Sequence, residues 1–122
     1  MKTKVLIVIG TICLLMAGCK DSREAFLEEY ITTADEIVRI VDANPTTAGV
    51  TQAQAYLDSK KASLKSKFDA GKHAGHDQEM EDKFLVIVPA CVKKVDSLSE
   101  KHPNLKSQLD SLSKDFGDFL LK

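Results

Sequence analysis

LKSQLDSLSKDFGDFLL occupies residues 105–121 and carries the most regular hydrophobic pattern of the chain. Apolar side chains recur there at alternating steps of four and three residues, at Leu105, Leu109, Leu112, Phe116 and Phe119. Steps of this size bring side chains to one side of an α-helix. With Pro103 at a favoured first helical position, the stretch predicts a helix over about 103–121 that must bury its apolar stripe against other elements.

Three further segments show helical spacing of apolar residues, and they cover about 22–43, 47–70 and 77–100. Asn44 and Pro45 separate the first two, because the residue before a proline is disfavoured in helical conformation. Gly71 ends the second segment, and Asp77 is a suitable N-cap for the third. Four amphipathic helices with short connections predict an all-α fold, a small antiparallel up-down bundle.

Two features of the third segment leave alternatives open. Residues 77–121 could form one kinked helix, which would give a bundle of three long helices. The run Phe84–Val88 is apolar all round, which predicts a helix covered on most sides. Because β-branched residues are frequent in the run, a short buried strand is the alternative there.

Charge favours the first two helices as antiparallel neighbours. Residues 21–42 hold seven acids and two bases, whereas residues 50–72 hold five lysines and two aspartates. Surface ion pairs contribute only about 0–1 kcal/mol each, so they bias the orientation of the helices more than they stabilise the fold.

The N-terminal residues have the features of a secretory signal. Lys2 and Lys4 precede a run without charges from Val5 to Gly18. The run is shorter than the roughly 20 apolar residues that a membrane-spanning helix needs, and its length is typical of a signal peptide.

The segment Leu15-Met16-Ala17-Gly18-Cys19 resembles the lipobox of bacterial lipoproteins, with methionine where leucine is usual. The resemblance implies removal of residues 1–18, lipid attachment at Cys19 and a single mature domain over 19–122. Two or more acyl chains would hold the chain stably on a membrane. The resemblance therefore implies a bacterial cell-membrane location facing the periplasm or exterior. In enterobacterial lipoproteins an aspartate directly after the cysteine favours the inner membrane, so by the same resemblance Lys20 favours the outer membrane.

The composition argues against nucleic acid as a partner. The chain has 17 basic and 18 acidic residues, and loss of Lys2 and Lys4 with the signal leaves a net charge of −3. Nucleic-acid binders normally present a basic face or stripe.

His73 and His76 are the candidate metal ligands, because they flank two small residues in a glycine-containing loop. Two imidazoles could bind zinc, copper or nickel, but a closed zinc site needs four ligands and the other two are not evident. We therefore expect solvated histidines and assign no metal.

Cys91 falls on the expected core stripe of the third helix, where cysteine acts as a small hydrophobic residue. The sequence has no Cys-x-x-Cys-His, no Glu-x-x-His and no phosphate-binding glycine loop, so we expect no cofactor and no catalytic residues. A lysine cluster could meet anionic lipid headgroups or an acidic partner, but a solvated face paired with the acidic first helix is favoured. Its members are Lys60, Lys61, Lys65, Lys67 and Lys72.

These observations predict a lipid-anchored envelope protein that is not an enzyme. The expected role is binding a protein partner, as part of an assembly or as an inhibitor. The alternative is a bundle that binds a metal or small ligand in transport or sensing.

Overall fold

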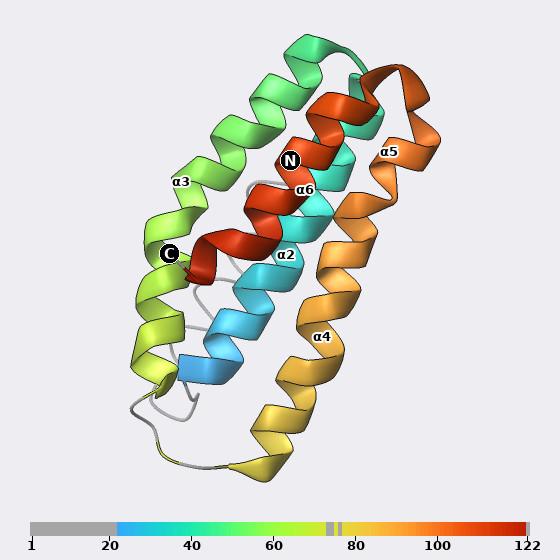
Figure 1. The fold of residues 1–122 in the computed structure, drawn as a ribbon. Coiled ribbons are helices and arrows are strands. Elements are labelled where there is room, and N and C mark those ends of the chain that lie inside the picture. The colour runs from blue at the N-terminus through green and yellow to red at the C-terminus, as the bar shows by residue number, and fades with distance from the viewer. Residues whose placement is uncertain (1–21, 73–74, 76, 122) are drawn as a thin grey trace, which may run out of the picture.

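The computed structural model describes residues 22–72, 75 and 77–121, and all regular structure in these residues is helical (Figure 1). The four main helices are α2 (Ser22–Ala43), α3 (Thr47–Lys72), α4 (Gln78–Asp96) and α6 (Lys106–Asp118). Three single turns complete them, namely α5 (Leu98–Lys101), η2 (Pro103–Leu105) and η3 (Phe119–Leu121). The predicted all-α bundle of four helices is confirmed, and the alternative of three long helices is wrong.

Local side chains set the helix ends. The Gly49 backbone N–H donates to Thr46 Oγ1 at 3.2 Å, which satisfies a free donor at the start of α3. At the start of α4 the Met80 N–H donates to Asp77 Oδ1 at 3.2 Å, so Asp77 is the N-cap as predicted. The break after α5 falls at His102, before Pro103.

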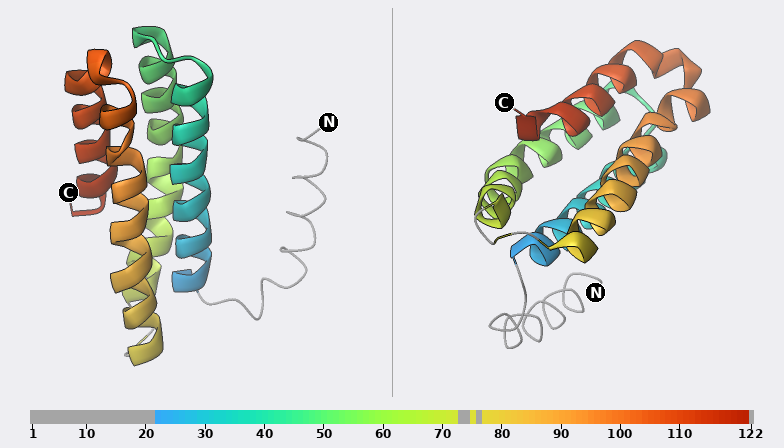
Figure 2. Two further views of the ribbon diagram at one scale, coloured as in Figure 1. Left: turned by 90° about the vertical axis from the view of Figure 1, so that its right-hand side faces the viewer. Right: turned by 60° about the horizontal axis from the view of Figure 1, so that its bottom comes forward.

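The four main helices alternate in direction along the chain. α4 lies beside α2, and α6 lies beside α3. α2 packs against both α3 and α4, and α6 packs against both α4 and α3 (Figures 1 and 2). Lys94 Nζ lies 2.6 Å from Asp35 Oδ1, and Lys101 Nζ lies 3.4 Å from Asp42 Oδ2. Both partners advance by seven residues between these pairs, so α2 runs parallel to the α4–α5 segment.

The predicted antiparallel contact of the first two helices is confirmed. α2 and α3 share the most extensive helix contact in the described part of the chain. Lys67 Nζ on α3 lies 2.7 Å from Glu29 Oε1 on α2, so an ion pair joins the basic helix to the acidic one.

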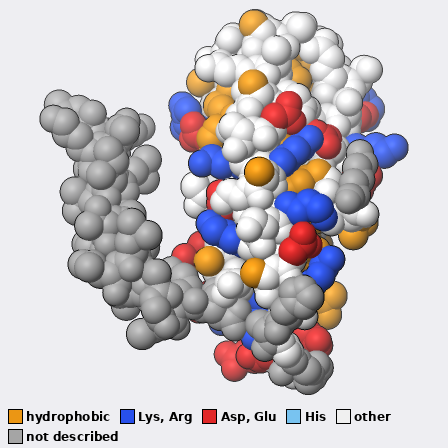
Figure 3. Space-filling model, turned by 90° about the vertical axis from the view of Figure 1, so that its left-hand side faces the viewer, with side chains coloured by type: hydrophobic (Ala, Val, Ile, Leu, Met, Phe, Trp, Pro, Cys, Tyr) orange, Lys and Arg blue, Asp and Glu red, His pale blue; other side chains and the backbone are white. Residues whose placement is uncertain are grey.

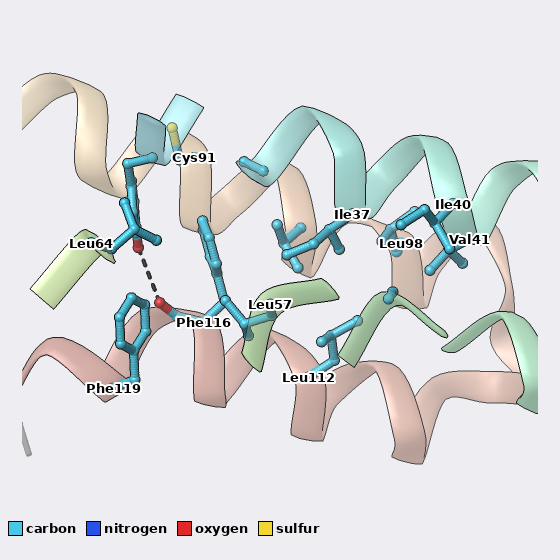
Figure 4. Packing of buried hydrophobic residues seen from close by; sticks show 14 of the residues in the cluster. Ile37, Ile40, Val41, Leu57, Leu64, Cys91, Leu98, Leu112, Phe116 and Phe119 are labelled. Carbon is cyan, nitrogen blue, oxygen red and sulfur yellow. Dashed lines mark hydrogen bonds between the residues drawn. The ribbon is translucent and has the colours of Figure 1, made fainter. Parts of the chain in front are cut away.

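Stacked aromatic rings join the helices at the centre of the core (Figure 4). The Tyr30 ring stacks on Phe116 with centroids 4.4 Å apart and on Phe26 with centroids 5.3 Å apart. The Tyr30 hydroxyl donates to the Phe116 carbonyl at 3.1 Å, the hydrogen bond drawn as a dashed line. This contact crosses the bundle from α2 to α6, and aromatic stacking of this kind adds to the free energy of burial.

The run Phe84–Val88 is helical, so the strand alternative is wrong. The expectation that this part of the helix is covered on most sides is also wrong, because Leu85 is 73% and Val86 70% exposed. α4 lies at an outer edge of the bundle and turns a different face, which includes Cys91, toward the core. Pro89 is exposed as well, and as a proline it offers no amide donor to the carbonyl of Leu85, four residues before it.

Candidate functional site

The candidate site residues from the sequence lie outside the described part of the chain. This holds for Cys19, for His73 and for His76. α2 begins at Ser22, three residues after Cys19. Within residues 22–72, 75 and 77–121, no three His, Cys, Asp or Glu side chains form a group that could hold a metal ion.

A groove opens at the end of the bundle where α2 begins, and we call it the basal groove. α6 and η3 end partway along α3 and α4, and Lys65 Nζ on α3 contacts the Leu120 carbonyl at 3.2 Å (Figure 1). Beyond this level α2 is the only other described helix beside α3 and α4, and the space between them measures about 420 Å³. The lining residues are Arg23, Phe68, Gly71, Lys72, Gly75, Met80, Glu81, Phe84 and Leu85.

Aromatic rings form the floor of the basal groove. Phe68 of α3 and Phe84 of α4 lie with their centroids 6.4 Å apart. Beneath them the fully buried Phe26 ring lies 5.4 Å from Phe68 and 5.5 Å from Phe84. These contacts hold a rigid apolar surface that is suited to apolar side chains of a ligand.

Arg23 fixes the end of the groove. Its Nη1 donates to the Gly75 carbonyl at 3.0 Å, and Nη2 lies 4.0 Å from Asp77 Oδ2. Gly75 has a φ of 90°, a backbone conformation that glycine adopts without steric cost. Gly71 leaves room for the arginine, since a Cβ there would lie 2.6 Å from Arg23 Cγ. The guanidinium therefore ties the start of α2 to the connection between α3 and α4.

The two walls of the basal groove differ in charge. On the α3 wall Lys72 Nζ lies 5.0 Å from the centroid of the Phe68 ring, which keeps the ammonium beside the apolar floor. On the α4 wall Glu81 is exposed at the rim. The groove therefore has an apolar floor, with Lys72 at one rim, where it also pairs with Asp69 at 3.5 Å, and Glu81 at the other.

The lysine cluster lies on α3 among acidic side chains (Figure 3). Lys67 pairs with Glu29 of the first helix, as predicted, whereas Lys61 Nζ pairs with Asp115 of α6 at 2.6 Å. Burial lowers the pKa of Lys61, but hydrogen bonds to Asp115 and Asp58 outweigh it, so the net pKa is raised. Sequence reasoning missed Asp115, because no local pattern distinguishes it from other acids on α6.

Cys91 is buried in the core, 7% exposed, as predicted. Burial raises the pKa of its thiol, the nearby Lys94 lowers it and Asp35 raises it further, with a net rise. Burial also raises the pKa of the Tyr30 hydroxyl, so this group stays a neutral hydrogen-bond donor. Both groups are therefore poorly suited to nucleophilic chemistry, which needs a lowered pKa.

In the part of the chain that the structure describes, no buried side-chain nitrogen or oxygen lacks a hydrogen-bond partner. Nor does any helix there combine the length and apolar character needed to cross a membrane. Comparisons of the chain with protein-family models, curated protein sequences and solved structures gave no match.

Proposed function

We propose that this protein is a lipid-anchored, non-catalytic binding module of a bacterial cell envelope, whose basal groove receives an apolar helix of a protein partner. The observation that carries the proposal is the position of the groove. Arg23, the second residue of α2, lines it, and the proposed lipidated residue Cys19 precedes Ser22 by three positions. Three extended residues span at most about 10 Å, so the anchor would hold the groove near the bilayer.

The charged side chains of the groove and the way in which α6 packs against α3 and α4 define the expected partner. Farther from the base of the bundle, α6 packs against both α3 and α4, and Asp115 of α6 forms an ion pair with Lys61 of α3. A partner helix in the basal groove would continue this arrangement. It would place apolar side chains on the Phe68 and Phe84 floor, an acid beside Lys72 and a base beside Glu81.

The anchor is tested by Cys19→Ser in a bacterium that processes lipoproteins. Without the thioether the bundle has no acyl chains, so we expect loss of the mass of the lipid and no cleavage before residue 19. Mass spectrometry of the purified chain measures both, and Cys91→Ser serves as the control that keeps the lipid. Unchanged mass and processing of the Cys19→Ser chain would contradict the anchor and leave the groove proposal standing.

The groove is tested by a photo-reactive amino acid at Lys72, which is exposed at the rim, in intact cells. We expect one discrete crosslinked protein from this position and none from Glu100 at the opposite end of the bundle. Glu81→Lys should reduce the yield about tenfold, because it places like charges against the basic side of the partner. Glu100→Lys makes the same charge change away from the groove and should leave the yield unchanged. A product that forms equally in Glu81→Lys would show that the groove does not bind the partner.

A further inference from the structure

A second surface of the bundle is apolar and lies on the outward side of α4. Its residues recur at helical spacing over three turns, and all are exposed. We call this surface the outer face of α4, and it consists of Asp82, Leu85, Val86, Pro89, Ala90 and Lys93. α4 stands in front of the other described helices when the bundle is viewed from this side (left view of Figure 2). Leu85 and Val86 are 73% and 70% exposed at adjacent positions, and a contiguous apolar patch that is open to solvent marks a docking surface.

The outer face of α4 has opposite charges at its two ends. Asp82 lies one turn before Leu85 and Val86, and Lys93 lies one turn after Pro89 and Ala90. A second α4 running antiparallel across the midpoint of this face would bring Asp82 of each copy against Lys93 of the other. A parallel second copy would instead set aspartate against aspartate and lysine against lysine.

The same antiparallel alignment also matches side-chain sizes. Leu85 falls close to Pro89 of the second copy, and Val86 falls close to Ala90. The midpoints of these two pairs, residues 87 and 88, lie within half a residue of 87.5, the midpoint of Asp82 and Lys93. Large side chains therefore meet a flat ring or a methyl group, which lets the helices approach closely. Charge and size complementarity thus agree on a single register.

We propose that the outer face of α4 is a self-association surface that binds a second copy of this chain in antiparallel orientation. The pair is isologous, so each contact occurs twice about the twofold axis. A contact made by one helix per copy falls at the small end of specific interfaces, and the dimer is therefore weak and concentration-dependent. This inference concerns a different partner from the basal groove and does not depend on it, and the two surfaces share only Leu85, which lies at the edge of both.

Charge reversal in the purified full-length chain tests the register. Sedimentation equilibrium in a density-matched detergent measures the dimer dissociation constant. Asp82→Lys alone and Lys93→Asp alone each set like charges together and should weaken the homodimer about tenfold. An equimolar mixture of the two variants restores both opposite-charge pairs in the heterodimer. The dissociation constant of that mixture should return to within about threefold of the original value.

The apolar part of the surface is tested by Val86→Glu, which should also weaken the dimer about tenfold or more, because it buries an unpaired carboxylate. Leu121→Glu makes a comparable change at an 82% exposed position on η3 and should leave the dissociation constant unchanged within about twofold. Helical circular dichroism of each variant checks that the bundle still folds.

A wild-type chain that stays monomeric at the highest concentration reached would overturn the proposal. So would a mixture of the two charge variants that associates no better than either variant alone, because this result excludes the antiparallel register. Crosslinking from position 86 to a different protein, or insertion of this face into lipid vesicles without dimer formation, would assign the surface to another occupant.

Discussion

Gly49, in the first turn of α3, packs against the turn that connects α2 to α3. A Cβ at this position would overlap the backbone carbonyl oxygen of Asn44. This carbonyl is held in place by the turn, where it accepts a hydrogen bond from the Thr46 N–H at 2.8 Å. A backbone atom cannot move aside as a flexible side chain can. We therefore predict that Gly49→Ala lowers the free energy of unfolding by about 1–3 kcal/mol, as overpacking does elsewhere.

Gly117 provides the control for this substitution. A Cβ there would lie 3.6 Å and 3.7 Å from the two methyl groups of Val92, which is an ordinary contact distance. Because alanine favours a helix over glycine by up to about 1 kcal/mol, Gly117→Ala should leave stability unchanged or raise it. Urea unfolding followed by circular dichroism measures both variants. Equal effects of the two substitutions would contradict the steric argument at Gly49.

At the scale of elements, the end of α2 is joined to the α5–η2 turn by one aspartate. His102 Nε2 lies 2.9 Å from Asp42 Oδ1, and Lys101 Nζ lies 3.4 Å from Asp42 Oδ2. The hydrogen bond with His102 lowers the pKa of Asp42, burial raises it, and Lys101 lowers it further. The net pKa in the folded chain is below the ordinary aspartate value of about 3.9.

The direction of this shift predicts how stability depends on pH. A carboxyl group whose pKa is lowered by folding contributes stability above its unfolded pKa and loses the contribution as the pH falls through its folded pKa. We therefore expect Asp42→Asn to be less stable than the wild type at pH 6–7, and the difference to shrink below pH 4. Urea midpoints of both proteins across this range give the comparison. A difference that is constant with pH would show that the Asp42 charge does not stabilise the turn.

The sequence predicted the elements well because their signals are local. Spacing of apolar residues located the helices, and Pro45, Asp77 and Pro103 marked ends that the structure bears out within a few residues. The exposure of Val86 was not predictable in this way, because hydropathy does not reveal which side of a helix receives neighbours. The basal groove also escaped prediction, since it depends on where α6 ends relative to α3 and α4.

At the scale of the whole molecule, the described helices number four over most of the length of the bundle and three at its base. The first turns of α4 have α2 beside them, but α6 ends before it reaches them. The buried residues of α4 are Met80 in its first turns and Cys91 and Val95 in its last turns. The base is therefore expected to open locally at a lower free-energy cost than the rest.

Hydrogen exchange measured by mass spectrometry checks this expectation. Amides in residues 80–85 should exchange about tenfold faster than those in residues 91–96 of the same helix, because fewer packed side chains hold the first turns in place. α2 is the control, since it contacts both α3 and α4. The exchange rates of its amides should differ less between the base and the upper part of the bundle than those of α4. Uniform protection along α4 would mean that the fourth helix is not needed to stabilise the base.

The parallel placement of α2 beside α4 has a consequence for how the chain folds. α2 with α3, and α4 with α6, are two antiparallel hairpins, each closed by a short connection. The contacts between the hairpins join residues about 60 positions apart, such as Asp35 with Lys94. Contacts between residues near each other in sequence form with less loss of chain entropy than distant ones. The hairpins are thus the natural early units of folding, and their docking on each other is the late step that completes the shared core.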